Sequence, residues 1–258
     1  MSYRAVDIVE YIEKLADPKY QESWDNSGWQ IKSDVDVNKV LICMDLTLER
    51  IEYALKNEFQ LIITHHPMFF SGIKSIQDDY KSKMIKKLVM NNICVYSAHT
   101  SFDVSNSGVN KVLFDFLMLE EPKDLIITDS GKGLGLIGVN KNFKSINELL
   151  KFLESNLLVD SYKVYGRSIK DINKIALIGG SGASEIQSAI DNGADVYLTS
   201  DVKHHDAQIA YENDLILIDI SHNDSEKLAL KWMSEYIKEK FDIEIETMLD
   251  NAFTLKLD

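Results

Sequence analysis

The chain has 258 residues, of which 45% are hydrophobic and 27% charged, a composition typical of a globular protein with one large core or two smaller ones. Its formal net charge of −13 argues against nucleic acid as a partner, because nucleic-acid binders present Lys and Arg surfaces. No segment approaches the roughly 18 to 20 apolar residues of a membrane span, so we expect a cytoplasmic protein with no membrane partner. Cys43 and Cys94 lie in apolar runs without zinc-site spacing, which indicates buried free thiols.

The first half of the chain alternates predicted helices and strands. An amphipathic helix comes first, with Ile8, Ile12 and Leu15 on one face. The segment from Trp24 to Asp34 is rich in turn formers and is predicted to be a polar loop. Connections of the β-α-β type predict parallel neighbouring strands. The elements that follow are a strand at 39–44, a helix at 48–57, a strand at 61–63, a helix at 80–90 and a strand at 93–97.

The predicted strand at 61–63 stops at His65, His66 and Pro67. A short continuous apolar run is typical of a strand covered on both faces, and open α/β sheets bind ligands beyond the carboxyl ends of their strands. An isolated histidine pair is more often a pair of hydrogen-bonded turn residues. The next strand, however, is followed by His99 and Asp103, so two successive strands carry metal-competent side chains to one edge of the sheet.

A change of composition near residues 121–123 predicts two α/β lobes, 1–122 and 123–258. The second lobe contains GKGLGLIGV (131–139), which lacks the spacing of a phosphate-binding loop and is interpreted as a glycine-containing strand beside a hairpin. Its first predicted elements are strands at 125–128 and 133–140, a helix at 145–156 and a strand at 162–165.

A second β-α-β unit is predicted from Lys174 to Asp201. It aligns without gaps with residues 39–66, and strand, turn, helix and strand fall in the same order and length. We therefore hypothesise that the two lobes share a related plan. A short helix, a strand at 215–220, a helix to about residue 240 and a strand-like C-terminal segment complete the lobe. His222 and Glu226, four residues apart, fall on one face of the last helix.

All six histidines lie at or just beyond the carboxyl ends of predicted strands. This clustering favours a metal site over scattered structural histidines. Imidazole and carboxylate ligands together suit Zn, Mn, Fe or Co, and five protein ligands suit two ions bridged by a carboxylate better than one ion with open positions. We therefore predict two divalent metal ions per subunit in a cleft between the lobes, with residues 215–258 contributing ligands across the cleft. The candidate ligands are His65, His66, Asp103, His222 and Glu226.

Eight short motifs run in order along nearly the whole chain: WDNSG (24–28), MDLT (44–47), ITHHP (63–67), SAHTSFD (97–103), GVN (108–110), GGSG (179–182), DVYLTSDVKHHDA (195–207) and SHNDSE (221–226). Together they resemble the GTP cyclohydrolase 1 type 2 homologue family, also called Nif-three-like, in its compact form without an inserted domain. The resemblance implies a two-lobed α/β fold, a toroidal homohexamer of stacked trimers and a dinuclear metal centre held by the five residues named above. Departures that affect pocket shape rather than metal binding are Trp29, Ser101, Ser200 and His204.

The leading functional hypothesis is a metal-dependent hydrolase of a small molecule, in which the ions activate water and Glu226 bridges or orients it. The family name implies hydrolytic ring opening of GTP or a related nucleotide, and phosphoester hydrolysis is the enzymatic alternative. A non-enzymatic metal-binding ring, acting in metal handling or as a regulatory partner, is the alternative from another class. His99 and His205 are candidate acid/base catalysts or partners that orient a ligand. A structural hydrogen bond to the backbone is equally open for both, and His204 is predicted to be peripheral.

Overall fold

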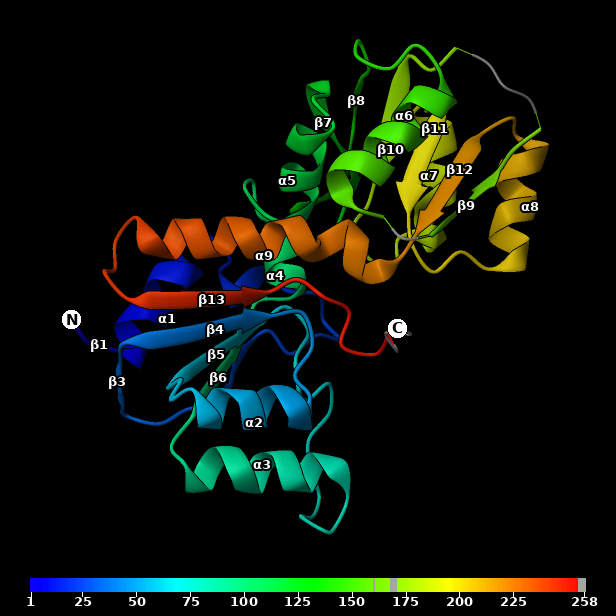
Figure 1. The fold of residues 1–258 in the computed structure, drawn as a ribbon. Helices are drawn as coiled ribbons and strands as arrows, with labels where there is room; N and C mark the ends of the chain where they lie inside the picture. Colours follow the sequence, from blue (N-terminus) through cyan, green and yellow to red (C-terminus); the bar gives the residue numbers. More distant parts are fainter. Residues whose placement is uncertain (160, 168–170, 255–258) are drawn as a thin grey trace. The chain divides into compact units, whose positions relative to one another are not determined.

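The computed structural model describes residues 1–159, 161–167 and 171–254, and it has a mixed α/β fold with several sheets (Figure 1). The chain divides into two compact units, Met1–Phe102 with Leu230–Asp258, and Asp103–Ala229. The sequence placed one boundary near residue 123 instead. The last strand of the chain pairs with a strand of the first unit, so the residues from Leu230 onward group with that unit and not with the second.

The first unit is built on a five-stranded sheet in the order β13-β4-β5-β6-β2. The first four strands of this order are parallel, which confirms the predicted parallel pairing, and β2 is antiparallel to β6. Every residue of β5 is buried, as expected for a strand covered on both faces. The strands are β2 (Gly28–Ile31), β4 (Lys39–Cys43), β5 (Leu61–Thr64), β6 (Cys94–Ser97) and β13 (Glu244–Met248); β1 (Tyr3–Arg4) and β3 (Asp36–Val37) form a separate pair.

Helices cover both faces of this sheet. On one face lie α2 (Leu48–Lys56) and α3 (Tyr80–Met90) (Figure 1). Their side chains Ile51 and Leu88 pack into a core with Ile62. Successive side chains of a strand point to opposite faces. Val95 of β6 belongs to that core, and the next residue, Tyr96, donates a hydrogen bond to Glu13 at the end of α1 (Ala5–Glu13). The N-terminal helix therefore lies on the opposite face.

The segment Trp24–Asp34, predicted to be a loop, contains the edge strand β2, so this prediction was wrong in part. Gly28 and Trp29 pair with Ser97 and Tyr96 of β6, and the Trp29 ring meets the Tyr96 ring edge-on at 5.6 Å. The strand forms because β6 offers a free edge and an aromatic surface. Its own sequence, crowded by turn formers, does not show the alternation of a strand.

The second unit is built on a six-stranded sheet in the order β7-β8-β10-β11-β12-β9, in which β10, β11 and β12 are parallel and the others antiparallel to their neighbours. The strands are β7 (Glu120–Ile127), β8 (Gly133–Val139), β9 (Tyr162–Tyr165), β10 (Lys174–Leu177), β11 (Val196–Thr199) and β12 (Ile216–Ile220). The GKGLGLIGV segment is therefore a strand in a hairpin, as predicted.

Helices cover both faces of this sheet too. Leu177 and Leu198 share one core with Leu113 of helix α5 (Val109–Phe116) and Leu149 of helix α6 (Ile146–Phe152). Tyr197 lies in a second core on the other face. The predicted β-α-β unit is present as β10, α7 and β11, with Ile175 opposite Val196. A structural relation between the two units stays a hypothesis. The helices are α4 (Thr100–Asp103), α5 (Val109–Phe116), α6 (Ile146–Phe152), α7 (Ile186–Asp191), α8 (His204–Glu212) and α9 (His222–Lys238), with short helical turns at Pro18–Tyr20, Leu153–Leu157 and Ala183–Glu185.

Both cysteines are free thiols and buried, as predicted. Burial raises the pKa of Cys43 to about 12, so this thiol stays protonated at neutral pH. Within the described ranges, none of the helices has the length and apolar character needed to cross a membrane.

Candidate metal centre

Three histidines gather at one edge of the first unit's sheet. His65 and His66 follow β5 directly, and His99 follows β6, the parallel neighbour of β5 in the same register. The three ring centroids lie 5.1, 5.2 and 5.3 Å apart. One ligand atom from each ring falls within 4.8 Å of the others, so the three can hold a metal ion.

Each of these rings is fixed through its Nδ1 atom. In the metal sites of proteins, a histidine ligand commonly donates its second ring N–H to a carbonyl or carboxylate, which fixes the tautomer and the ring orientation. All three acceptors are of this kind, so Nδ1 carries the proton and Nε2 is the atom suited to bind metal. The pairs are His65 Nδ1 with Ala98 O at 2.8 Å, His66 Nδ1 with Asp45 Oδ1 at 2.8 Å, and His99 Nδ1 with Asp25 Oδ1 at 2.7 Å.

Asp25 joins the WDNSG motif to the segment after β6. Besides His99, its fully buried carboxylate accepts hydrogen bonds from Thr100 N at 3.1 Å, Thr100 Oγ1 at 2.6 Å and Ser27 Oγ at 2.7 Å. Burial raises the pKa of Asp25, but the hydrogen bonds from His99, Thr100 and Ser27 outweigh burial and hold the pKa below its ordinary value. Asp25 is therefore ionised and accepts the hydrogen bond from His99 Nδ1.

The second unit holds a different set of ligand types. His222, the first residue of α9, has Nδ1 2.7 Å from Asp201 Oδ2 and Nε2 3.2 Å from Glu226 Oε2. This contact confirms that His222 and Glu226 share one face of the helix. A carboxylate oxygen of Asp103 lies within 4.8 Å of one of Glu226, whose side chain is buried. Imidazole and two carboxylates thus converge at the start of α9.

A glycine loop supports this second set. Gly180 has φ +72°, and a Cβ built there would overlap Glu226 Oε1 and lie 3.2 Å from His222 Nε2. Only glycine combines this backbone conformation with such a close approach to the carboxylate. Gly180 N donates to Ser225 Oγ at 2.8 Å, which ties the loop to the first turn of α9.

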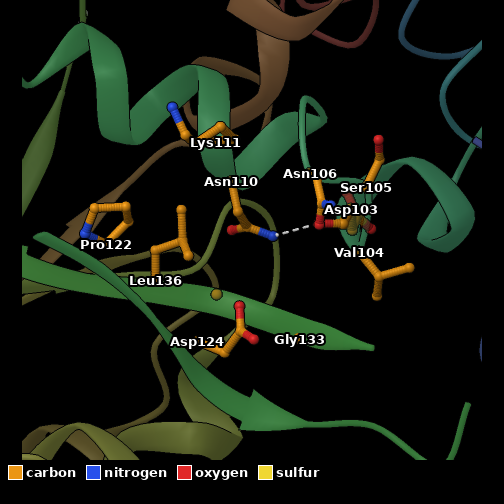
Figure 2. A pocket seen from close by; sticks show the side chains of 11 residues that line it. Asp103, Val104, Ser105, Asn106, Asn110, Lys111, Pro122, Asp124, Gly133 and Leu136 are labelled. Atoms are coloured by element: carbon orange, nitrogen blue, oxygen red, sulfur yellow. Dashed lines mark hydrogen bonds between the residues drawn. The ribbon is translucent and has the colours of Figure 1, made fainter. Parts of the chain in front are cut away.

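Asn110 of the GVN motif connects the same loop to Asp103. Its side-chain amide donates to Asp103 O at 3.0 Å, and its Oδ1 accepts from Gly179 N at 2.9 Å. Figure 2 shows Asn110 between the hairpin strands and the turn that carries Asp103, beside a cavity of about 230 Å³. Because Asn110 is buried and satisfied on both sides, it fixes the backbone from which Asp103 projects.

The two remaining histidines lie elsewhere. His204 and His205 are exposed on the first turn of α8, and His205 Nδ1 is 3.5 Å from Gln208 Oε1. Across the described part of the chain, neither belongs to a group of side chains that can hold a metal. The peripheral position of His204 and the catalytic role of His205 stay predictions.

Sequence reasoning missed three carboxylates that accept hydrogen bonds from the histidine rings of these clusters. Asp25, Asp45 and Asp201 stand inside the WDNSG, MDLT and DVYLTSDVKHHDA motifs, so their signal was present. Their ring partners lie 74, 21 and 21 residues away along the chain. The three imidazoles of the first unit, and the imidazole with two carboxylates of the second, are donor sets that fit Zn, Mn, Fe or Co.

Known proteins are similar to this chain over nearly its whole length. A family model described as Duf34/NIF3 (NGG1p interacting factor 3) matches residues 3–252. A Nostoc sp. protein named GTP cyclohydrolase 1 type 2 homolog is 35% identical over 242 residues, which are 91% of this chain and 91% of that protein. The structure of reduced HcgD from Methanocaldococcus jannaschii matches with a TM-score of 0.85 and 31% identity, covering 96% of this chain and 98% of its own. A Bacillus cereus protein related to NIF3 has the same fold, with a TM-score of 0.90 at 21% identity over 100% and 99% of the two chains.

Proposed function

Because the chain belongs to the Duf34/NIF3 family, we propose that it is a metal-dependent hydrolase acting on GTP or a related nucleotide. The observation that carries the proposal is the cluster of His65, His66 and His99, in which every Nδ1 atom is held by an acceptor. Such orientation is characteristic of metal ligands. One ring nitrogen of each histidine lies within 4.8 Å of the others, close enough for His65 and His66 to bind an ion with His99 beside it.

We further propose that the ligands of the two units bind the same pair of divalent ions, Zn, Mn, Fe or Co. Two observations support this part, each made within one unit. The first unit supplies imidazoles alone, and the second supplies an imidazole with two carboxylates, which are the groups able to bridge two ions. The ligands in this proposal are His65, His66, Asp103, His222 and Glu226.

Bound divalent ions would supply Lewis acidity, which lowers the pKa of water and stabilises developing negative charge. Glu226 is the residue best suited to bind and orient the attacking water. Its carboxylate is buried, and His222 Nε2 lies 3.2 Å from its Oε2. Loss of this carboxylate should therefore remove both a ligand and the group that directs the water.

His99 is proposed to move a proton at Nε2. It lies in the same cluster as the two ligand histidines, but it is outside the set of five that the family motifs assign. Asp25 accepts from its Nδ1 at 2.7 Å, which leaves Nε2 as the ring atom free for proton transfer. A ring held in this way beside the two ligand histidines can pass a proton to a leaving group.

The substrate is proposed from the name of the relatives, GTP cyclohydrolase 1 type 2 homolog. The reaction would be hydrolytic opening of the imidazole ring of the guanine base, and hydrolysis of a phosphoester is the alternative within the same chemistry. A toroidal homohexamer is part of the proposal. Light scattering should give six times the subunit mass, and a monomer would contradict the toroid.

The test measures metal content and turnover in the same samples. Protein purified with Mn, Zn or Fe should hold two metal ions per subunit and hydrolyse GTP or a simple phosphoester. His65→Ala and Glu226→Ala should lose metal and turnover, whereas the control His204→Ala, at an exposed histidine, should keep both. Turnover that survives in His65→Ala and Glu226→Ala would contradict the hydrolase. Stoichiometric metal without turnover on a broad panel would favour a non-enzymatic metal-binding ring.

A further inference from the structure

The first unit contains a second feature that the proposed chemistry leaves unused, a cavity of about 350 Å³ with His66 in its wall. Small-molecule sites are concave and mostly apolar, with a few polar groups, and have volumes of roughly 300 to 1,000 Å³. This cavity is of that kind. Met68 and Met84 are its buried apolar residues, and aromatic side chains from three separate segments complete its wall.

The aromatic residues of the wall are unusually exposed. Phe70 is 51%, Tyr80 63% and Phe253 72% exposed, although each is large and apolar over most of its surface. Single exposed apolar residues are common, but several around one cavity mark a binding site. Aromatic walls with exposed faces bind flat rings by stacking, at little cost in side-chain entropy.

The aromatic wall continues to the histidine cluster. Trp24, 58% exposed, stacks on Phe70 with a centroid distance of 6.4 Å and an interplanar angle of 28°. Both rings meet His99 edge-on, Trp24 at 5.7 Å and Phe70 at 5.8 Å. A flat ring that binds against Phe70 would therefore lie beside His66 and His99.

The wall of the cavity also carries positive charge. Lys81 lines it, and no carboxylate in the described ranges forms an ion pair with this lysine. Asp45 is a carboxylate of the same wall, and it is held against His66 Nδ1 at 2.8 Å. Lys81 is therefore the position in this wall at which an anionic group can be bound.

The segment that carries Phe253 is held in place from within the unit. Arg50, 5% exposed, donates to Asp250 O at 2.7 Å and to Asp45 O at 2.8 Å. The same guanidinium thus fixes the C-terminal wall of the cavity and the backbone of the residue that orients His66.

We propose that this aromatic cavity binds a heteroaromatic ring of the substrate between Phe70 and Tyr80, with an anionic group of the same molecule at Lys81. The assignment of this molecule as a substrate rests on the proposed function. The binding itself rests on the exposed aromatic wall and the cation. A flat ring with a phosphate satisfies both requirements, whereas an aliphatic phosphoester satisfies only the second.

The test uses three probes on the metal-loaded full chain: guanosine 5′-monophosphate, guanosine and ribose 5-phosphate, with binding measured by calorimetry. The monophosphate should bind most tightly and ribose 5-phosphate most weakly. Phe70→Ala should weaken binding of both guanosine compounds roughly 5- to 150-fold, the cost of losing one stacked ring. Lys81→Ala should weaken the two phosphorylated probes, guanosine 5′-monophosphate and ribose 5-phosphate, and leave guanosine unchanged. Val89→Ala, on the exposed side of α3 and outside the cavity, is the control and should change neither.

Metal content, turnover and mass are measured on the same samples, so the two proposals fail separately. Equal guanosine affinity in the wild type and Phe70→Ala, or no binding in the wild type, overturns the aromatic cavity even if a phosphoester is hydrolysed. Guanosine binding that depends on Phe70 in a protein without turnover supports the cavity and overturns the hydrolase. A change of mass by light scattering in Phe70→Ala would assign the aromatic wall to contact with a second copy of the chain, and would also overturn the inference.

Discussion

Replacing Gly180 by alanine should displace Glu226 and weaken metal binding. Gly180 has φ +72°, and its new methyl group would overlap Glu226 Oε1. Carbon atoms make optimal contact at about 3.5 to 4.0 Å, so the carboxylate must move. Glu226 is 3% exposed, and moving its carboxylate away from residue 180 should disturb its contact with His222 Nε2 at 3.2 Å.

Gly193→Ala is a matched control, because Gly193 has φ +71° and the nearest atom to its new Cβ is Lys174 Nζ at 3.9 Å. Both variants place an L residue in the left-handed region, at a cost of roughly 1–2 kcal/mol, partly offset by roughly 0.4–1 kcal/mol through the unfolded chain. The net backbone penalty of about 1 kcal/mol is common to both. Any further loss in Gly180→Ala is therefore the cost of displacing Glu226.

The assay combines urea unfolding with metal content after dialysis against a chelator. Gly193→Ala should lose about 1 kcal/mol of unfolding free energy and keep its metal. Gly180→Ala should lose more, and its metal affinity should fall by roughly 10- to 100-fold, as when a supporting contact of a ligand is lost. Equal stability and equal metal content in the two variants would refute the assignment of Glu226 as a ligand held against Gly180.

Three further changes test how the first unit holds its histidines. Asp45→Ala removes the acceptor of His66 Nδ1 at 2.8 Å, and metal affinity should fall roughly 10- to 100-fold by equilibrium dialysis; unchanged affinity would mean that this contact does not orient a ligand. Arg50→Ala breaks the bond to Asp250 O, so hydrogen exchange should accelerate around Asp250 and leave β5 unchanged. Because the pKa of Asp25 is lower in the folded chain than its ordinary value of 3.8, the ionised carboxylate stabilises the fold at pH values above 3.8. This stabilisation is lost as the pH falls from 3.8 through the folded pKa. The stability difference between wild type and Asp25→Ala, from urea unfolding, should therefore be larger at pH 6 than below pH 4, and a constant difference would contradict the ionised carboxylate.

The strands and helices that carry the histidines could be predicted because their signals are local. The apolar run at β5 is contiguous and fully buried. Thr47 and Asp79 accept hydrogen bonds from Arg50 N and Ser82 N, the contacts expected of residues that begin helices. The family could be predicted too, since eight motifs in order are far more specific than any single one, and this resemblance is confirmed.

What could not be predicted depends on contacts between distant residues. β2 exists because it pairs with β6, and the division of the chain follows from the pairing of β13 with β4, whose strands are about 200 residues apart. Asp25 was quoted within a motif, yet nothing in its spacing indicates that it accepts from His99, 74 residues away. Spacing predicts which residues share a helix face, as for His222 and Glu226, but not which loops meet beyond the end of a sheet.

The three acceptors that orient the histidine rings differ in kind, and this difference has a consequence for the site. The acceptor of His65 is the carbonyl of Ala98, whose own N–H bonds to Thr64 O at 2.9 Å and continues the pairing of β5 with β6. No side-chain substitution removes this acceptor, so the orientation of His65 is as stable as the sheet itself. His66 and His99 depend instead on single carboxylates in loops. His65 should therefore keep its position when the loops change. Substitutions at Asp45 and Asp25 should move the rings of His66 and His99 relative to it.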